Sequence, residues 1–367
     1  MEHQQPGASA PEPAAPDANA VDAFGNRLIG MLDEAGTALM TSIGHRTGLF
    51  DAMARLPPAT SEELAREAGL DERYVREWLG AMTTARMVEY EPRGGRYRLP
   101  AAHAALLTRA ATPNNVAVYA QYVALLGSVE DRIVECFRRG SGVPYSAFDR
   151  FHEVMAEDSG QSVVGALEAI VALVPGLEED LRSGISVLDV GCGSGRALVA
   201  LARAYPRSRF TGHDFSEEAI RAARAAAAEH GLTNVAFEVR DAAGPVGDER
   251  YELVTAFDAI HDQADPAAAL RAIRRRLAPD GIFLMQDIRA SSALERNLDH
   301  PLAPFLYTVS VMHCMTVSLA QGGAGLGTMW GEERARAMLA DAGFGEVSVH
   351  TLPHDIQNCF YLVHAAG

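Results

Sequence analysis

The sequence contains no lysine, and all 32 of its basic residues are arginine. A chain without lysine cannot form a lysine Schiff base with a carbonyl compound, and it cannot supply the lysine of a phosphate-binding P-loop. Two large classes of enzyme are therefore excluded. Cysteine is scarce as well: the chain has four, none in C-x-x-C spacing, which is typical of a reduced cytoplasmic protein and indicates no zinc site.

The sequence also has little positive charge and no long apolar run. We see no stretch of about 18 apolar residues, so we expect no membrane-spanning helix. The N-terminus lacks the basic stretch and apolar core of a secretory signal, so we expect a cytoplasmic location. The net charge of −16 disfavours binding to nucleic acids or acidic membranes.

The 367 residues, 48% of them hydrophobic, are enough for two packed domains. Residues 1–20 are rich in Ala, Pro, Gln and Ser and predict a disordered tail. We assign residues 21–110 to a winged-helix and dimerisation domain, and residues 111–183 to a helical linker that forms a pocket wall. Residues 184–367 form the second domain, in which the long segment 291–329 is expected to cover a substrate.

The winged helix is predicted from the order of its local signals. A long helix with an apolar period comes first, and Thr60 and Glu63 then form a capping box for a second helix. Asp71 caps a third helix, which is followed by strand-like runs at 87–91 and 96–99. Three helices and a hairpin are the winged-helix order. The buried face expected for the third helix consists of Tyr74, Val75, Trp78, Leu79 and Met82.

The charge of this domain argues against DNA recognition. Residues 60–85 hold six acidic residues against three arginines, whereas a helix that enters the major groove needs the reverse balance. We therefore interpret the domain as a dimerisation module that also walls the pocket. Its apolar helices predict a homodimer.

From residue 184 onward, short β-rich runs alternate with helices, which predicts an α/β domain. We expect a Rossmann-like, seven-stranded parallel sheet covered by helices on both faces. The predicted strands are 186–190, 209–214, 235–239, 253–257, 282–287, 347–351 and 360–364. The predicted helices are 196–205, 217–230, 266–277 and 332–342.

The first of these strands ends in a glycine loop. Gly191, Gly193 and Gly195 permit a tight turn and let a ligand touch the backbone at the start of a helix. Nucleotide-binding folds of several kinds use such a loop. A dinucleotide fingerprint requires its third glycine at the sixth place, where this chain has Arg196. The spacing therefore disfavours a nicotinamide oxidoreductase.

Two acidic residues follow the next two strands. Asp214 ends the second strand, where a carboxylate can accept hydrogen bonds from both ribose hydroxyls. Asp241 follows the third strand, where a carboxylate can accept a hydrogen bond from the adenine amino group. A single acid at such a place is often only a solvated loop residue. The glycine loop and two acids at successive strand ends together predict a nucleoside site.

These residues resemble the motifs that bind S-adenosylmethionine (AdoMet) in class I methyltransferases, over residues 186–287. The resemblance implies AdoMet as cofactor and S-adenosylhomocysteine as product. It places Asp189 near the methionine end of the cofactor, Asp214 at the ribose, and Asp241 with Ala242 at the adenine. The complete predicted cofactor site is Asp189, Gly191, Gly193, Gly195, Asp214, Phe215, Asp241, Ala242 and Phe257.

The wider chain is similar to a bacterial, notably mycobacterial, family that joins a winged-helix domain to this fold. The runs at residues 142–145 and 313–320 carry this likeness, which extends over nearly all of residues 21–367. The resemblance supplies no substrate. We expect a small molecule.

A looser likeness connects residues 260–265 with the O-methyltransferases of secondary metabolism, whose His-Asp-Trp-Ser-Asp segment carries the general base. By that likeness His261 is the candidate base, although Gln263 stands in place of the tryptophan. A histidine at the carboxyl edge of a sheet, with a pKa near 6.5, suits removal of a hydroxyl proton. The alternative is that His261 only lines the site or bonds a loop.

Further side chains are candidates for shaping the substrate pocket, although core packing is the alternative for each aromatic one. They are Tyr119, Tyr122, Asp262, His313, Cys314 and Trp330. The spacing of His261, Asp287 and His313 does not resemble that of metal ligands, so we predict no metal.

Three readings of the function stay open. The first is methyl transfer to a small molecule, where oxygen, nitrogen, sulfur and carbon acceptors are possible and His261 favours oxygen. The second is an NAD-dependent oxidoreductase. The third is a winged-helix transcription regulator that senses AdoMet. AdoMet binding without methyl transfer is a separate, fourth possibility.

Overall fold

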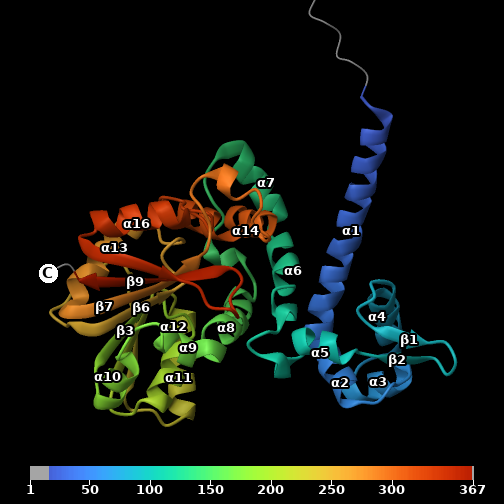
Figure 1. Ribbon diagram of the computed structural model, residues 1–367, viewed down its shortest axis with the longest axis horizontal. Coiled ribbons are helices and arrows are strands. Elements are labelled where there is room, and N and C mark those ends of the chain that lie inside the picture. Colours follow the sequence, from blue (N-terminus) through green and yellow to red (C-terminus); the bar gives the residue numbers. More distant parts are fainter. Residues whose placement is uncertain (1–15, 366–367) are drawn as a thin grey trace, which may run out of the picture.

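The structure, a computed structural model, describes residues 16–365. Figure 1 shows a group of helices around the long helix α1 (Ala18–Thr47) beside a larger α/β domain. α1 includes the last three residues of the predicted tail, because Asp17 caps it by accepting the Asn19 N–H at 3.0 Å. Residues 1–15 of the predicted tail lie outside the described residues.

The winged helix forms at the positions that its capping residues predicted. After α1 come α2 (Leu49–Arg55), α3 (Ser61–Ala68), α4 (Glu72–Thr84), β1 (Glu89–Glu91) and β2 (Arg96–Arg98). Thr60 and Glu63 make the capping box of α3, and Asp71 accepts hydrogen bonds from the first turn of α4. The predicted buried face of α4 is wrong at Tyr74, which is 80% exposed. Tyr74 lies about 100° around the helix from Val75, at the edge of that face.

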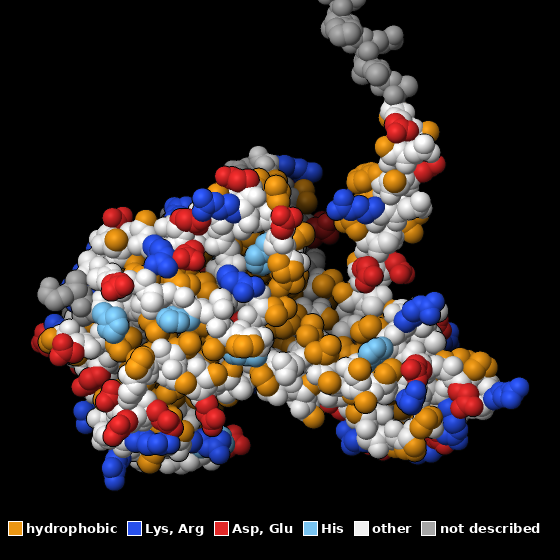
Figure 2. Space-filling view, in the orientation of Figure 1, with side chains coloured by type: hydrophobic (Ala, Val, Ile, Leu, Met, Phe, Trp, Pro, Cys, Tyr) orange, Lys and Arg blue, Asp and Glu red, His pale blue; other side chains and the backbone are white. Residues whose placement is uncertain are grey.

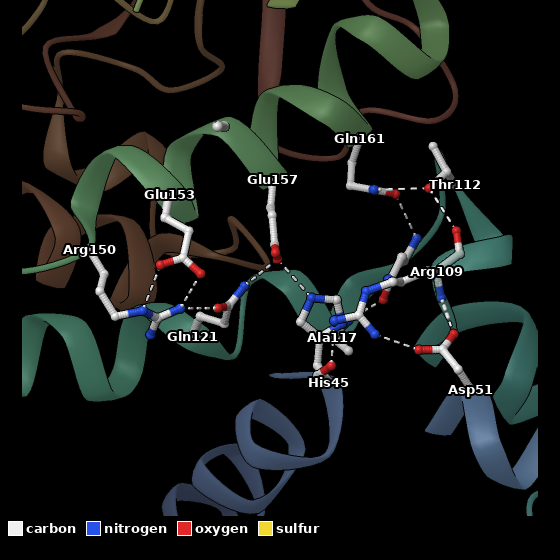
Figure 3. Close-up of polar contacts among 12 residues, drawn as sticks. His45, Asp51, Arg109, Thr112, Ala117, Gln121, Arg150, Glu153, Glu157 and Gln161 are labelled. Carbon is white, nitrogen blue, oxygen red and sulfur yellow. Dashed lines mark hydrogen bonds and ion pairs between the residues drawn. The ribbon is translucent and has the colours of Figure 1, made fainter. Parts of the chain in front are cut away.

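Short helices connect the winged helix to the sheet. They are α5 (Ala101–Leu107), η1 (Arg109–Ala111), η2 (Val116–Val118), α6 (Gln121–Gly127), α7 (Glu130–Arg139), η3 (Tyr145–Ala147), α8 (Phe151–Ser162), η4 (Val164–Ala166), α9 (Leu167–Val171) and α10 (Leu177–Ser183). In Figure 3, Glu157 of α8 lies 2.8 Å from Nε2 of His45 and accepts a hydrogen bond from Gln121 at 2.7 Å. The guanidinium of Arg109 lies 2.6 Å from Asp51. The Glu157 contacts hold one face of α8 against α1 and α6, whereas the Arg109–Asp51 contact joins η1 to α2.

The sheet has the strand order β5-β4-β3-β6-β7-β9-β8. Its strands are β3 (Ser186–Val190), β4 (Arg209–Asp214), β5 (Val235–Val239), β6 (Tyr251–Phe257), β7 (Leu277–Ile288), β8 (Phe344–His350) and β9 (Asn358–Ala365). The bounds of β3, β4 and β5 are those predicted, and each other predicted strand overlaps an observed one. The prediction of a parallel sheet is wrong for β9, which runs antiparallel to β7 and β8. The connection from β8 to β9 is too short for the crossover that a parallel pair needs.

Helices cover both faces of the sheet, as predicted (Figure 1). They are α11 (Arg196–Ala204), α12 (Glu217–Glu229), α13 (Pro266–Arg276) and α16 (Gly331–Asp341). Successive strand residues point to opposite faces. Val187 therefore packs in the core beneath α11 and α12, whereas Leu188 packs in the core beneath α13 and α16. The carboxyl ends of the parallel strands are the edge at which such sheets bind ligands.

Residues 291–329 form the segment between β7 and α16. It contains η5 (Leu294–Arg296), α14 (Ala303–Val309), η6 (Ser310–Cys314) and α15 (Met315–Ala320). The last three are continuous, and this helix, Ala303–Ala320, has a mean hydropathy of 1.3 and is long and apolar enough to cross a membrane. The helix includes polar residues such as Ser310 and His313, so it is not the unbroken apolar run that we expected to be absent. Leu306 and Val317 of this helix are buried in apolar clusters of the protein, as in a core helix.

Candidate active site

A cavity of about 180 Å³ lies at the carboxyl ends of β3, β4 and β6. The glycine loop, the segment after β6, α8 and the helix Ala303–Ala320 contribute its walls. The predicted site residues that line it are Tyr122, Asp189, Gly191, Gly193, Asp214, Phe215, Phe257, His261, Asp262, His313 and Cys314. The predicted site residues outside its lining are Tyr119, Gly195, Asp241, Ala242 and Trp330.

The three glycines of the loop serve two purposes. All have positive φ: 74° at Gly191, 52° at Gly193 and 71° at Gly195. A Cβ at Gly191 would lie 2.4 Å from Cβ of Ala259, and one at Gly195 would lie 2.6 Å from the ring of Phe237. No atom lies within 4 Å of a Cβ built at Gly193. The outer glycines thus permit close packing, while Gly193 leaves bare backbone toward the cavity.

Two buried carboxyl groups flank the loop. Asp189 accepts a hydrogen bond from the Thr255 hydroxyl at 2.7 Å, and burial raises the pKa of Asp189 to about 7. Asp214 accepts the Gly193 N–H at 2.9 Å and the Ser216 N–H at 2.8 Å, and burial raises its pKa as well. Asp214 is therefore fixed beside the bare backbone of the loop.

The residues predicted to frame adenine lie outside the cavity lining. Asp241 is exposed after β5, and its carboxylate accepts the N–H of Ala243 at 2.9 Å. Ala242 packs against the core beneath α13 and α16. Their role toward a base stays a prediction.

His261 follows β6 and is buried. Its Nδ1 lies 2.8 Å from Oδ1 of Asp287 in β7. The same oxygen accepts the indole N–H of Trp330 at 2.9 Å and the backbone N–H of Ile288 at 2.8 Å. Burial by itself would lower the pKa of His261, but the charge of Asp287, followed by that of Cys314, outweighs burial and raises this pKa well above its usual range. Asp287 is the acid that orients His261, and sequence reasoning did not assign it.

Trp330 does not stand in the pocket where we expected it. Its side chain is 3% exposed and packs in the core beneath α13 and α16. Its indole points at Asp287, so its contact with the site runs through that carboxylate. The sequence does not tell whether an aromatic residue at the end of segment 291–329 packs in the core or lines the pocket. Only the tertiary packing distinguishes the two.

The far end of the cavity is aromatic. His313 of η6 stacks on Phe151 with ring centroids 3.6 Å apart, and neither ring nitrogen has a hydrogen-bond partner. Burial lowers the pKa of His313 well below its usual range, so this ring is neutral. Tyr122 lines the cavity and donates a hydrogen bond to Asp158 at 2.7 Å. Tyr119 is not among the lining residues, although it packs against the same apolar cluster as Tyr122.

Several lining residues were not predicted. Phe151, Met155, Asp158 and Ser159 of α8 line the cavity at positions i, i+4, i+7 and i+8, which is one helix face. This spacing was readable, but it does not tell which face of a linker helix meets a pocket. Asp258, directly after β6, was also missed, although its place at a strand end marks it as a candidate.

Comparison with known proteins finds one family in each part of the chain. An Rv2258c-like winged HTH domain matches residues 35–109, and a methyltransferase domain matches residues 181–343. Nocamycin O-methyltransferase from Saccharothrix syringae is 38% identical over 104 residues, and ubiquinone biosynthesis O-methyltransferase from Serratia proteamaculans is 35% identical over 109 residues. These matches cover 28% and 29% of the chain. The chain spans only 37% and 44% of these curated relatives.

Two solved structures resemble almost the whole fold. The mitomycin 7-O-methyltransferase has a TM-score of 0.69 and 18% identity, covering 95% of this chain and 100% of that one. Human N-acetylserotonin methyltransferase, solved in complex with AdoMet, has a TM-score of 0.68 and 18% identity, covering 97% and 100%. At such identity the likeness concerns the fold alone. This chain therefore joins an Rv2258c-like winged helix-turn-helix domain to a methyltransferase domain.

Proposed function

We propose that the protein uses AdoMet to methylate a hydroxyl oxygen of a small molecule. The observation that carries this proposal is that the buried His261–Asp287 pair and the glycine loop line one cavity or support its lining. Methyl transfer from a sulfonium is an in-line displacement, so a protein contributes by orienting the reactants and by removing the acceptor's proton. The O-methyltransferases among the relatives support the choice of oxygen.

The residues around the loop fit the cofactor. Gly193 offers bare backbone, and Asp214 beside it can accept the two ribose hydroxyls. Asp189 would face the methionine end, while Asp241 and Ala242 are kept as proposed contacts of the adenine. Bound AdoMet supplies the methyl group on a positively charged sulfur.

His261 is the proposed general base. Because its Nδ1 lies against Asp287, Nε2 is the nitrogen that takes the proton of the acceptor hydroxyl. Asp287 keeps the ring in this tautomer and stabilises its charge after proton transfer. A nearby positive charge lowers the pKa of a histidine, so His261 loses its own proton more readily when the cofactor is present.

Calorimetry with three compounds tests the cofactor. We expect AdoMet and S-adenosylhomocysteine to bind and NAD not to bind. Binding of NAD alone would establish the oxidoreductase reading instead. A screen of phenolic, amine and thiol acceptors with labelled AdoMet then tests the reaction, and label found only on nitrogen or sulfur would refute transfer to oxygen.

A regulator that reads DNA is less well supported. In the winged helix, Arg96 pairs with Glu63 at 3.0 Å, and Arg98 pairs with Glu89. Its cations are thus matched by acids, whereas DNA binding requires an excess of positive charge. A specific gel shift at low salt would revive this reading.

We also propose that α1 pairs with a second copy of the chain. In Figure 2, apolar side chains lie along the projecting part of α1. The exposed apolar residues there are Val21, Phe24, Leu28, Ile29, Met31 and Leu32. A single helix without tertiary packing is marginally stable in water, and a contiguous apolar patch of this kind marks an interface. A symmetric dimer would bury both copies of the patch.

A further inference from the structure

The cavity is rich in carboxyl groups. Asp189 and Asp214 flank the glycine loop, whereas Asp158 belongs to α8 and Asp258 follows β6. The lining includes one arginine, Arg196, whose guanidinium donates to a backbone carbonyl of α8 at 2.8 Å. The ion pairs found among residues 16–365 involve neither Asp158 nor Asp258.

Asp158 and Asp258 each have one carboxylate oxygen without a hydrogen-bond partner. Asp158 is 6% exposed; its Oδ2 accepts the Tyr122 hydroxyl at 2.7 Å, and its Oδ1 has no hydrogen bond. Oδ2 of Asp258 accepts the Gln286 side-chain amide at 2.8 Å, and its Oδ1 also has no hydrogen bond. Asp258 has a φ of 52°, which few residues other than glycine adopt.

Buried carboxylates without a partner are costly, so proteins pair them with cations or hydrogen-bond donors. The pKa values of both groups are raised, first by burial and then by other carboxylates, and that of Asp158 reaches about 7. A cation bound near these two carboxyl groups would relieve both effects. The proposed function gives Asp189 and Asp214 to the cofactor, so we assign Asp158 and Asp258 to the acceptor.

The surrounding walls are aromatic. Phe151 and Tyr122 line the same part of the cavity as Asp158, and Phe305 meets Tyr122 edge to face with ring centroids 6.1 Å apart. Aromatic faces stack on an aromatic ligand and also attract cations. Asp258 stands three residues before His261, and both residues line the cavity.

We infer that the acceptor is a hydroxylated aromatic amine, whose ammonium group is bound by Asp158 and Asp258 while its hydroxyl is presented to His261. This inference rests on the proposed function and names the substrate class of the same site. It excludes phenolic carboxylic acids, because a carboxylate would be brought against two more carboxylates.

Calorimetry on the full chain saturated with S-adenosylhomocysteine tests it with three phenols of similar size. Tyramine ends in an ammonium group, tyrosol in a hydroxyl and 4-hydroxyphenylacetate in a carboxylate. A charge-assisted hydrogen bond in a buried site predicts that tyramine binds about tenfold or more tightly than tyrosol. 4-Hydroxyphenylacetate is expected to bind most weakly.

Asp158→Asn and Asp258→Asn should each abolish the preference for tyramine over tyrosol. The matched control is Glu153→Gln, which removes one acid from the other face of α8 (Figure 3) and should keep the preference. Asp158→Asn retains an oxygen for Tyr122 and removes an unpaired charge, so it is expected to fold; Asp258→Asn provides an independent variant.

The outcomes separate the two claims. If S-adenosylhomocysteine does not bind, the proposed function fails. If it binds but tyramine fails to bind, or binds no better than tyrosol, or keeps its advantage in either aspartate variant, the inference is overturned and the proposed function stands.

Discussion

The Nδ1 atom of His261 and Oδ1 of Asp287 lie 2.8 Å apart, and both side chains are almost completely buried. The two residues come from the ends of adjacent parallel strands, β6 and β7. Trp330 donates to the same carboxylate oxygen from the far side. A histidine held by a fixed carboxylate beside a cavity is the arrangement that general-base chemistry needs.

Replacing the proposed base tests this directly. His261→Asn should lower kcat for an acceptor found by screening by about 100-fold to 10,000-fold, which is the usual contribution of a general base. The affinity for S-adenosylhomocysteine should stay unchanged, because His261 is not among the residues proposed to hold it. Single-turnover kinetics and calorimetry measure the two quantities, and near-normal turnover would remove His261 from the mechanism.

The pH dependence of the reaction follows from Asp287. Its charge raises the pKa of His261, and only the neutral ring accepts a proton, so kcat/KM should rise with pH through a pKa above the usual value of a histidine. Asp287→Asn removes that charge, so the acid limb should move to lower pH while kcat falls through loss of orientation. Titration of the His261 ring by NMR provides an independent measurement. If the low-pH limb of the kcat/KM profile does not move in Asp287→Asn, a group other than His261 controls that limb.

The buried acid Asp158 predicts a pH-dependent stability. Its pKa rises from 3.8 to about 7 on folding, so its contribution is complete below pH 3.8 and is lost as pH rises toward 7. In this window the free energy of unfolding should fall by about 1.4 kcal/mol per pH unit on account of this one group. Asp158→Asn should therefore be no more stable than the wild type near pH 4 and clearly more stable above pH 7. Urea unfolding at both pH values measures the difference, and a constant difference would contradict the assignment.

The two roles of the loop glycines can be separated by substitution. Gly191→Ala places a Cβ 2.4 Å from Ala259 at a φ of 74°, so we expect it to destabilise the fold by about 1–3 kcal/mol. Gly193→Ala meets no atom, so it should cost stability only through its φ and should chiefly weaken S-adenosylhomocysteine binding. Denaturant unfolding and calorimetry on both variants provide the comparison. If Gly191→Ala and Gly193→Ala lose equal stability, the space beside Gly193 is not open as the structure has it.

The proposed α1 interface predicts a change of oligomeric state. Leu32→Glu introduces a charge at a position that is 75% exposed in one chain, and it should convert a dimer into a monomer in light scattering. Leu298→Glu is the matched control, because Leu298 is also 75% exposed but lies in the segment between β7 and α16. A monomeric wild type, or a dimer that survives Leu32→Glu, would contradict the proposal.

The features that sequence reasoning predicted well are those set by neighbouring residues. Thr60 and Glu63 cap α3 because each needs only the other and the backbone between them. β3 and β4 have their predicted bounds because β-rich runs and turn residues mark strand ends within a few positions. Asp214 follows from the same rule, since the end of a strand defines where its last side chain stands.

The sequence by itself thus determined the winged helix, the glycine loop and the edge of the sheet at which the cavity lies. Tertiary structure alone decided that Asp287 orients His261, that Trp330 supports that carboxylate from the core, and that Asp158 faces the cavity. These relationships join residues far apart in the chain. They depend on which strands become neighbours and on which face of a helix packs inward, and no local pattern of side chains encodes either choice.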